Sequence, residues 1–214
     1  MTGMPEDLAE PPNFGTDVFS EVLDIVHVRG ETARVITSEG PLSVTVPAGQ
    51  LCVYILEMGQ LEIRVGSRPV VKLRQNQIAL LLQGVDHDVQ FGLSGLTTPP
   101  VGPTGPRTGG DGRETIKCFW GSFTVDGDLA ARLLQSLPPV IVLDDLAEAP
   151  IEWVDTVCDL VLRELGATRP GGALMVSRLL DLLLVILLRR WAQSEDRLPD
   201  WLAAAKDQRI ARAV

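Results

Sequence analysis

Few side chains in this sequence are of the types that hold metal ions or perform catalysis. The 214 residues contain only two histidines and three cysteines. His87 stands between Asp86 and Asp88, and Cys118 lies in a later apolar run. An imidazole and a thiolate together are typical zinc ligands, and Cys52 or either aspartate can complete such a site. Zinc held by His87 and Cys118 is therefore the candidate cofactor.

The same residues also have a structural interpretation. His87 can belong to a surface turn, and Cys118 can be a small buried apolar group. Cys158 follows the apolar stripe of a predicted helix and is expected in the core. The sequence has no glycine-rich phosphate loop between a strand and a helix, and no serine in a G-x-S-x-G turn. We therefore expect no enzymatic activity, with a single-metal enzyme as the alternative.

The composition excludes several classes of protein. The net charge is −9 and the pI about 4.7, so the chain lacks the excess of Lys and Arg that neutralises nucleic-acid phosphates. The three cysteines lack the regular spacing of a disulfide framework. The acidic N-terminal segment lacks the basic and apolar regions of a secretory signal. The apolar run 179–188 contains Asp181 and is much shorter than the ~20 residues of a membrane span. We expect a cytoplasmic protein that neither spans a membrane nor binds DNA by itself.

Between residues 32 and 125 the hydrophobic pattern is typical of short strands. Apolar and polar residues alternate, as in Leu42, Val44 and Val46, and glycines and prolines separate the runs. No helical period interrupts this series before residue 126. The pattern predicts a domain over residues 17–128 that contains an antiparallel barrel or sandwich, with strands at 42–46, 51–57, 61–65, 70–73, 77–82 and 115–125.

Helical periodicity is found on both sides of this region. We predict a short helix at 17–28 before the barrel. After it we predict three helices separated by an extended piece at 140–143; they cover residues 129–137, 151–165 and 172–193. The last is apolar around most of its circumference, so it needs partners on several sides. We expect a second subunit to cover part of it, with dimer contacts from Leu179, Leu180, Leu183 and Leu187.

The remaining segments complete the expected domain organisation. Residues 1–16 are expected to form a flexible arm. The stretch at about 92–114 is dense in glycine and proline, which predicts a disordered loop or lid between two strands of one sheet. Residues 129–206 are expected to be a helical linker and dimerisation region, and residues 207–214 the start of another domain.

Several motifs resemble those of AraC-type transcription regulators, whose N-terminal domain is a cupin barrel. Residues 46–66 (VPAGQLCVYILEMGQLEIRVG) are similar to the opening barrel strands. A C-x-x-G-x-F stretch at 118–123 is followed by Leu-Pro-Pro at 137–139. The segment 169–191 resembles the helices that pair subunits. Residues 200–214 resemble the approach to the first helix of the helix-turn-helix domain.

This resemblance implies an α+β chain: a cupin-like antiparallel barrel followed by a helical dimerisation segment. It implies a homodimer that binds a small effector and contacts DNA only through a C-terminal helix-turn-helix domain. That domain is absent from the sequence as it stands, so the chain is expected to be either a shortened regulator or a stand-alone sensor. Metal-dependent cupin enzymes carry three histidines and a glutamate. Here His27 lies outside the barrel pattern and Tyr54 stands where relatives often have histidine, so a three-histidine site cannot form.

The effector is then expected inside the barrel, because small barrels hold one small molecule or fill themselves with side chains. A partner-binding module with a filled barrel is the further alternative. The expected lining residues are mostly apolar, with one phenol and one imidazole to orient the effector. They are Tyr54, Leu56, Ile63, Leu81, His87, Phe91, Phe119 and Trp120.

Overall fold

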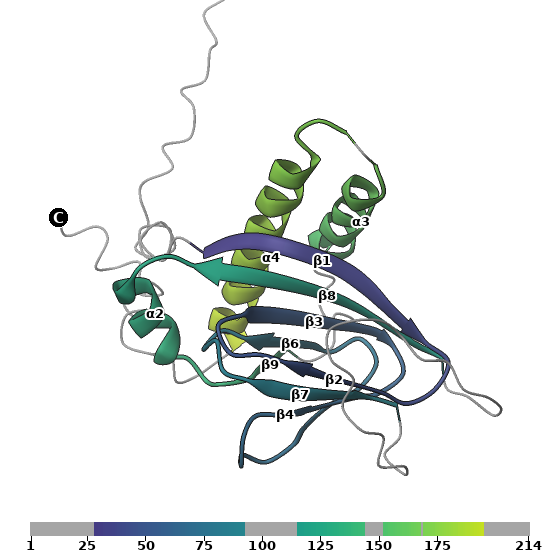
Figure 1. The fold of residues 1–214 in the computed structure, drawn as a ribbon, viewed down its shortest axis with the longest axis vertical. Helices are drawn as coiled ribbons and strands as arrows, with labels where there is room; N and C mark the ends of the chain where they lie inside the picture. The colour runs from purple at the N-terminus through teal and green to yellow at the C-terminus, as the bar shows by residue number, and fades with distance from the viewer. Residues whose placement is uncertain (1–27, 93–114, 144–151, 168, 195–214) are drawn as a thin grey trace, which may run out of the picture.

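A computed structural model describes residues 28–92, 115–143, 152–167 and 169–194 of the chain. The described residues form strands and three helices (Figure 1). In chain order the elements are β1 (Val28–Ser38), β2 (Leu42–Val46), β3 (Leu51–Met58), β4 (Leu61–Arg64), β5 (Val71–Leu73), β6 (Ile78–Leu81), β7 (His87–Phe91), β8 (Ile116–Val125), α2 (Asp128–Gln135), β9 (Ile141–Leu143), α3 (Glu152–Gly166) and α4 (Gly172–Ser194).

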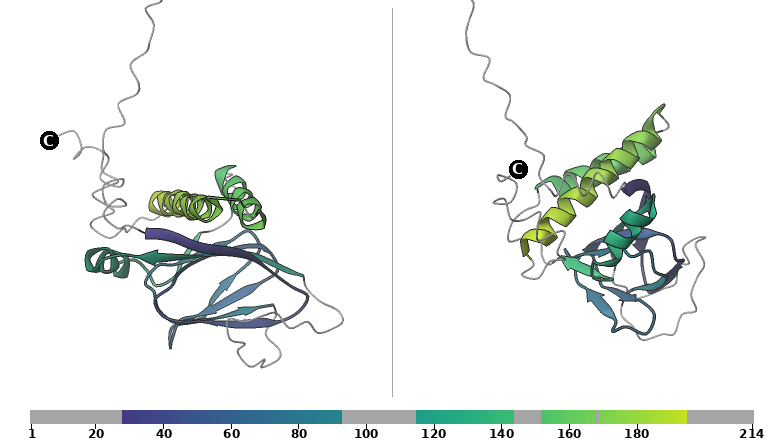
Figure 2. Two further views of the ribbon diagram at one scale, coloured as in Figure 1. Left: turned by 45° about the horizontal axis from the view of Figure 1, so that its top comes forward. Right: turned by 90° about the vertical axis from the view of Figure 1, so that its left-hand side faces the viewer.

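The strands form two antiparallel sheets that enclose a common interior. One sheet has the order β1-β8-β3-β6-β9, and the other has the order β2-β7-β4-β5. Figure 2 shows α3 and α4 on the outer face of the five-stranded sheet, with the four-stranded sheet on its opposite side. The predicted α+β architecture, an antiparallel barrel or sandwich followed by helices, is confirmed.

Alternation along the strands divides the apolar residues between two cores. In β3, Val53 and Ile55 belong to a core between the five-stranded sheet and the helices. Cys52, Tyr54 and Leu56 belong to a second core between the two sheets, called here the barrel interior. Because both faces of β3 are covered, its sequence is continuously apolar rather than alternating.

Helix α4 covers the five-stranded sheet of its own chain. Leu180, Leu183 and Leu187 are fully buried in the core between helix and sheet, and Leu179 is partly buried against the same core. The prediction that these leucines face a second subunit is therefore wrong for the three buried ones. The outer face of the sheet needs an apolar cover, and α4 supplies it within the chain. The exposed leucines of α4 include Leu182.

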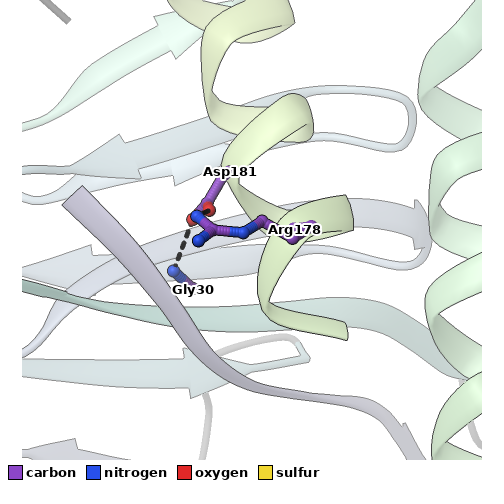
Figure 3. A network of polar contacts seen from close by, with 3 residues as sticks. All are labelled: Gly30, Arg178 and Asp181. Atoms are coloured by element: carbon purple, nitrogen blue, oxygen red, sulfur yellow. Dashed lines mark hydrogen bonds and ion pairs between the residues drawn. The ribbon is translucent and has the colours of Figure 1, made fainter. Parts of the chain in front are cut away.

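The backbone of β1 lies directly against α4, as Figure 3 shows for the polar contacts. The N–H of Gly30 donates to the Asp181 carboxylate at 2.7 Å, and that carboxylate also pairs with Arg178 at 3.0 Å. A Cβ on Gly30 would lie 2.3 Å from the Cβ of Leu180 and 2.8 Å from the carbonyl oxygen of Ser177. Only glycine allows this approach. The hydrogen bond from the Gly30 N–H also explains why the otherwise apolar helix α4 contains the acidic residue Asp181.

The structure changes several expected boundaries. The strand β1 begins at Val28, the last residue of the helix predicted at 17–28; the rest of that prediction lies outside the described residues. The expected loop is flanked by β7 and β8, which belong to different sheets, so its predicted position within one sheet is wrong. β9 pairs with β6, so the five-stranded sheet extends beyond residue 128.

The predicted helices at 129–137, 151–165 and 172–193 correspond to α2, α3 and α4, and Cys158 is buried as expected. None of the described helices is long and apolar enough to cross a membrane. The predictions for 1–16, for the loop from 93 to 114, and for 195–206 and 207–214 concern residues outside the described ranges.

Candidate functional site

The barrel interior brings together the residues predicted to contact an effector. Phe119 is the exception: it faces the helix side of the five-stranded sheet and is buried in the other core, because it is adjacent in sequence to inward-facing Trp120. His87 is buried and contacts the interior through Tyr54. The other predicted residues share the interior core; they are Tyr54, Leu56, Ile63, Leu81, Phe91 and Trp120.

A polar pair joins the two sheets inside this apolar space. The hydroxyl of Tyr54 on β3 lies 2.8 Å from Nε2 of His87 on β7, and Nδ1 of His87 lies 3.1 Å from the Val85 carbonyl oxygen. A carbonyl only accepts, so Nδ1 carries the hydrogen. Burial favours the neutral imidazole by lowering its pKa, and in that form Nε2 accepts from the Tyr54 hydroxyl.

Burial is the main influence on both groups. It lowers the pKa of His87 from its ordinary value and raises the pKa of Tyr54 well above its own. The neighbouring Asp86 and Asp88 are exposed, and Asp88 accepts a hydrogen bond from Thr45 at 2.7 Å. Because His87 is only 2% exposed, its interpretation as a surface-turn histidine is wrong.

The residues of the interior do not fit a zinc ion. Both nitrogens of His87 are already hydrogen-bonded, and the Cys118 thiol lies 3.4 Å from the Phe119 carbonyl oxygen. Burial raises the pKa of the Cys118 thiol, which opposes the thiolate form that metals need. His87 and Cys118 belong to different sheets. Among the described residues, no three His, Cys, Asp or Glu side chains are grouped to hold a metal.

A row of side chains crosses the five-stranded sheet at the polar end of the interior. Arg34 on β1 pairs with Trp120 on β8, which pairs with Tyr54 on β3. The Arg34 guanidinium lies 4.4 Å from the centre of a Trp120 ring, a cation–π contact. The Cys52 thiol lies beside the Trp120 and Tyr54 side chains, and burial raises its pKa to about 11. This row continues through Tyr54 to His87.

The sequence predictions did not include Arg34 as a site residue. The signal that identifies it is alternation: Arg34 and Ile36 are two residues apart on β1, so they share a face. Ile36 packs against the interior core. An arginine on the same strand face as an inward-facing apolar residue is a candidate ligand contact at the opening of the barrel.

The opposite end of the interior is apolar. Leu56, Leu61, Phe91 and Ile116 are each fully buried there. The strand pairs Leu61–Phe91 and Leu56–Cys118 place these side chains away from the row that carries Arg34. The interior thus has one polar and one apolar end, which is the polarity that an amphipathic small molecule would match.

A separate surface hollow of about 730 Å³ lies outside the barrel interior. It contains none of the residues predicted to contact an effector, and its lining is polar with a buried leucine. The lining residues are Gly59, Gln60, Lys72, Leu73, Arg74, Gln75 and Gln77. Lys72 is already paired with Glu62 at 2.8 Å. The interior, with its converging polar groups, is the stronger candidate site.

Replacing Tyr54 with phenylalanine is expected to lower the free energy of unfolding by about 1–3 kcal/mol, because Nε2 of buried His87 loses its donor. Urea unfolding of the variant measures this change. In the double variant Tyr54→Phe/His87→Leu, neither polar partner remains, and part of the loss should be recovered. A neutral single variant would contradict the assigned hydrogen bond.

Comparisons with known proteins agree with this architecture. A family model described as "Cupin" matches residues 17–193. No curated protein matches the chain significantly. Three similar solved structures are the Cnp3 cupin domain of Schizosaccharomyces pombe, YhaK of Escherichia coli, and unsaturated fatty acid-bound ToxT of Vibrio cholerae strain SCE256.

These three structures are distant from the chain. In the same order, the identities are 9%, 12% and 11%, and the TM-scores 0.31, 0.33 and 0.41. The alignments cover 50%, 53% and 86% of this chain, and 62%, 40% and 63% of the other chains. The chain therefore spans less than two thirds of each. At these identities and TM-scores the similarities establish no shared function.

Proposed function

Because the chain belongs to the cupin family, we propose that it is the effector-sensing and dimerising domain of an AraC-type transcription regulator, without enzymatic activity. The observation that carries the proposal is the Tyr54–His87 hydrogen bond at 2.8 Å. It places a phenol and a neutral imidazole inside an otherwise apolar interior. This small number of convergent polar groups in an apolar space is typical of small-molecule sites.

The pair supplies a physical basis for sensing. It links β3 of one sheet to β7 of the other. An effector that accepts from the Tyr54 hydroxyl or donates to His87 replaces this link, and the sheets then adopt a different spacing. Binding favours the second arrangement only by its differential affinity for the two states.

The change has a route to the helices. β3 carries Val53 and Ile55 on its helix side, next to Tyr54 on its interior side. On β8, a Cβ added to Gly121 would lie 3.0 Å from Val53 and 3.2 Å from Leu180 of α4. In the resembling regulators the DNA-binding domain follows these helices. A shift of β3 and β8 would therefore move α4 and, with it, the position of that domain.

The proposed dimer uses the outer faces of α3 and α4 rather than the buried leucines. Large apolar side chains are exposed on both helices, with exposed fractions between 42% and 66%. They include Trp153 and Leu160 on α3, and Leu174, Met175 and Leu182 on α4. Large apolar side chains exposed on two neighbouring helices are common at protein interfaces. The three cysteines are free and buried, which is compatible with the cytoplasm.

One observation favours a second candidate function, a partner-binding module. Most interior side chains are 0–1% exposed, so the interior is closely packed with its own side chains. In that case the barrel would be a rigid support, and the exposed apolar surface of α3 and α4 would bind a partner protein.

The two functions are distinguished by a probe at Tyr54, which is the only tyrosine in the chain. Incorporation of 3-fluorotyrosine gives one ¹⁹F NMR signal from the interior. With 4-phenylbutan-1-ol, an apolar body bearing one hydroxyl, we expect a saturable shift of that signal and a higher Tm. The His87→Leu variant is the control for the polar contact. A signal that does not respond would favour the partner-binding module.

A further inference from the structure

Arg34, at the polar end of the interior, is a cation without an ion pair among the described residues. Its guanidinium lies over the face of Trp120, 4.4 Å from the ring centre. Glu31 is close in sequence, but its carboxylate accepts from the Ser122 hydroxyl at 3.3 Å and is not within ion-pair distance of Arg34. A guanidinium has five N–H donors and no acceptor, so its edge remains available to an anion.

The groups beside Arg34 are also mainly donors. The indole N–H of Trp120 can only donate, and the Tyr54 hydroxyl is a donor that already serves His87. The one acceptor nitrogen of His87 is engaged by Tyr54. The donors of this row and the positive charge of Arg34 favour a ligand group that only accepts.

We propose that the effector is an amphipathic anion, whose carboxylate-like head binds the Arg34 guanidinium beside Trp120 and whose apolar body extends toward Leu56 and Phe91. This inference rests on the proposed function, because it names the chemical class of the molecule sensed in the barrel. An Arg guanidinium matches a carboxylate through two parallel N–H···O bonds, which a hydroxyl cannot form.

The net charge of the chain strengthens the role assigned to one arginine. At −9 the protein repels anions at long range. An anionic effector therefore needs a specific cation at the point of entry. Arg34 is exposed, whereas Trp120 and Tyr54 beside it are 6% and 1% exposed. The row thus leads from solvent to the buried polar pair.

Three probes with one apolar body test this assignment: 4-phenylbutanoate, 4-phenylbutan-1-ol and 4-phenylbutylamine. Titration of each is followed by the ¹⁹F signal of 3-fluorotyrosine at position 54. We expect the carboxylate to bind at least roughly tenfold more tightly than the alcohol, and the amine to bind most weakly. In Arg34→Gln the preference for the carboxylate should disappear.

Arg74→Gln is the matched control, since Arg74 is also an exposed arginine without an ion pair among the described residues, and it lies at the separate surface hollow. It should keep the preference. If alcohol and carboxylate bind equally, the anionic class is wrong. If Arg34→Gln keeps the preference, the assignment of the anionic head to Arg34 is wrong. In both cases sensing in the barrel stands. If no probe shifts the signal, both the anionic class and barrel sensing are overturned.

Discussion

Replacing Leu183 with aspartate is expected to unfold the chain rather than to separate a dimer. Leu183 is fully buried in the core between α4 and the five-stranded sheet. The substitution removes apolar contacts and introduces a carboxylate without a buried partner, at a cost above ~4 kcal/mol. A domain of this size has a total stability of only ~5–15 kcal/mol. Far-ultraviolet circular dichroism during urea unfolding measures the loss.

The adjacent residue provides the control. Leu182 is 48% exposed on the outer face of α4, so Leu182→Asp should change the free energy of unfolding by no more than ~0.5 kcal/mol. If the outer face forms the proposed dimer, sedimentation equilibrium should show a folded monomer for Leu182→Asp. A folded, monomeric Leu183→Asp together with a dimeric Leu182→Asp would instead support the buried leucines as the interface.

This contrast shows what periodicity can and cannot predict for α4. Its apolar circumference correctly predicted a long helix that needs partners on several sides. The pattern does not state whether a partner is another subunit or a sheet of the same chain. The sheet has two apolar faces, one for the barrel interior and one for a cover. The continuous apolar run of β3 indicates that both faces of the sheet are buried. The outer face therefore needs a cover, and this would have assigned Leu180 and Leu183 to the chain's own core.

The interior site was predictable in part. Ile63 was expected inside the barrel and lies there, and its strand β4 alternates between buried and less buried residues. Tyr54 and Leu56 were also placed correctly, although β3 is continuously apolar. Phe119 was placed wrongly because β8 is buried on both faces, so apolarity alone does not give its direction. The Tyr54–His87 hydrogen bond joins residues 33 positions apart in different sheets. Such a contact depends on how the sheets pack, which a local sequence pattern does not contain.

Gly30→Ala should lower the free energy of unfolding by about 3 kcal/mol, because the added Cβ overlaps α4. It would lie 2.3 Å from the Cβ of Leu180 and 2.8 Å from the carbonyl oxygen of Ser177. A Cβ and a backbone oxygen cannot rotate away, so α4 must move from β1. The displacement would also lengthen the 2.7 Å bond from the Gly30 N–H to Asp181. Urea unfolding measures the loss, and hydrogen exchange of the α4 amides locates it.

Gly166→Ala is the matched control, since an added Cβ there meets no atom within 4 Å and the change should lie within ~0.5 kcal/mol. The test also concerns the proposed sensing route. Faster exchange along α4 in Gly30→Ala, with the ¹⁹F signal of position 54 shifted as well, would show that helix position and barrel interior are coupled. An unchanged stability and unchanged α4 exchange would mean that β1 does not hold α4, and the route from Tyr54 to the helices would lose its physical basis.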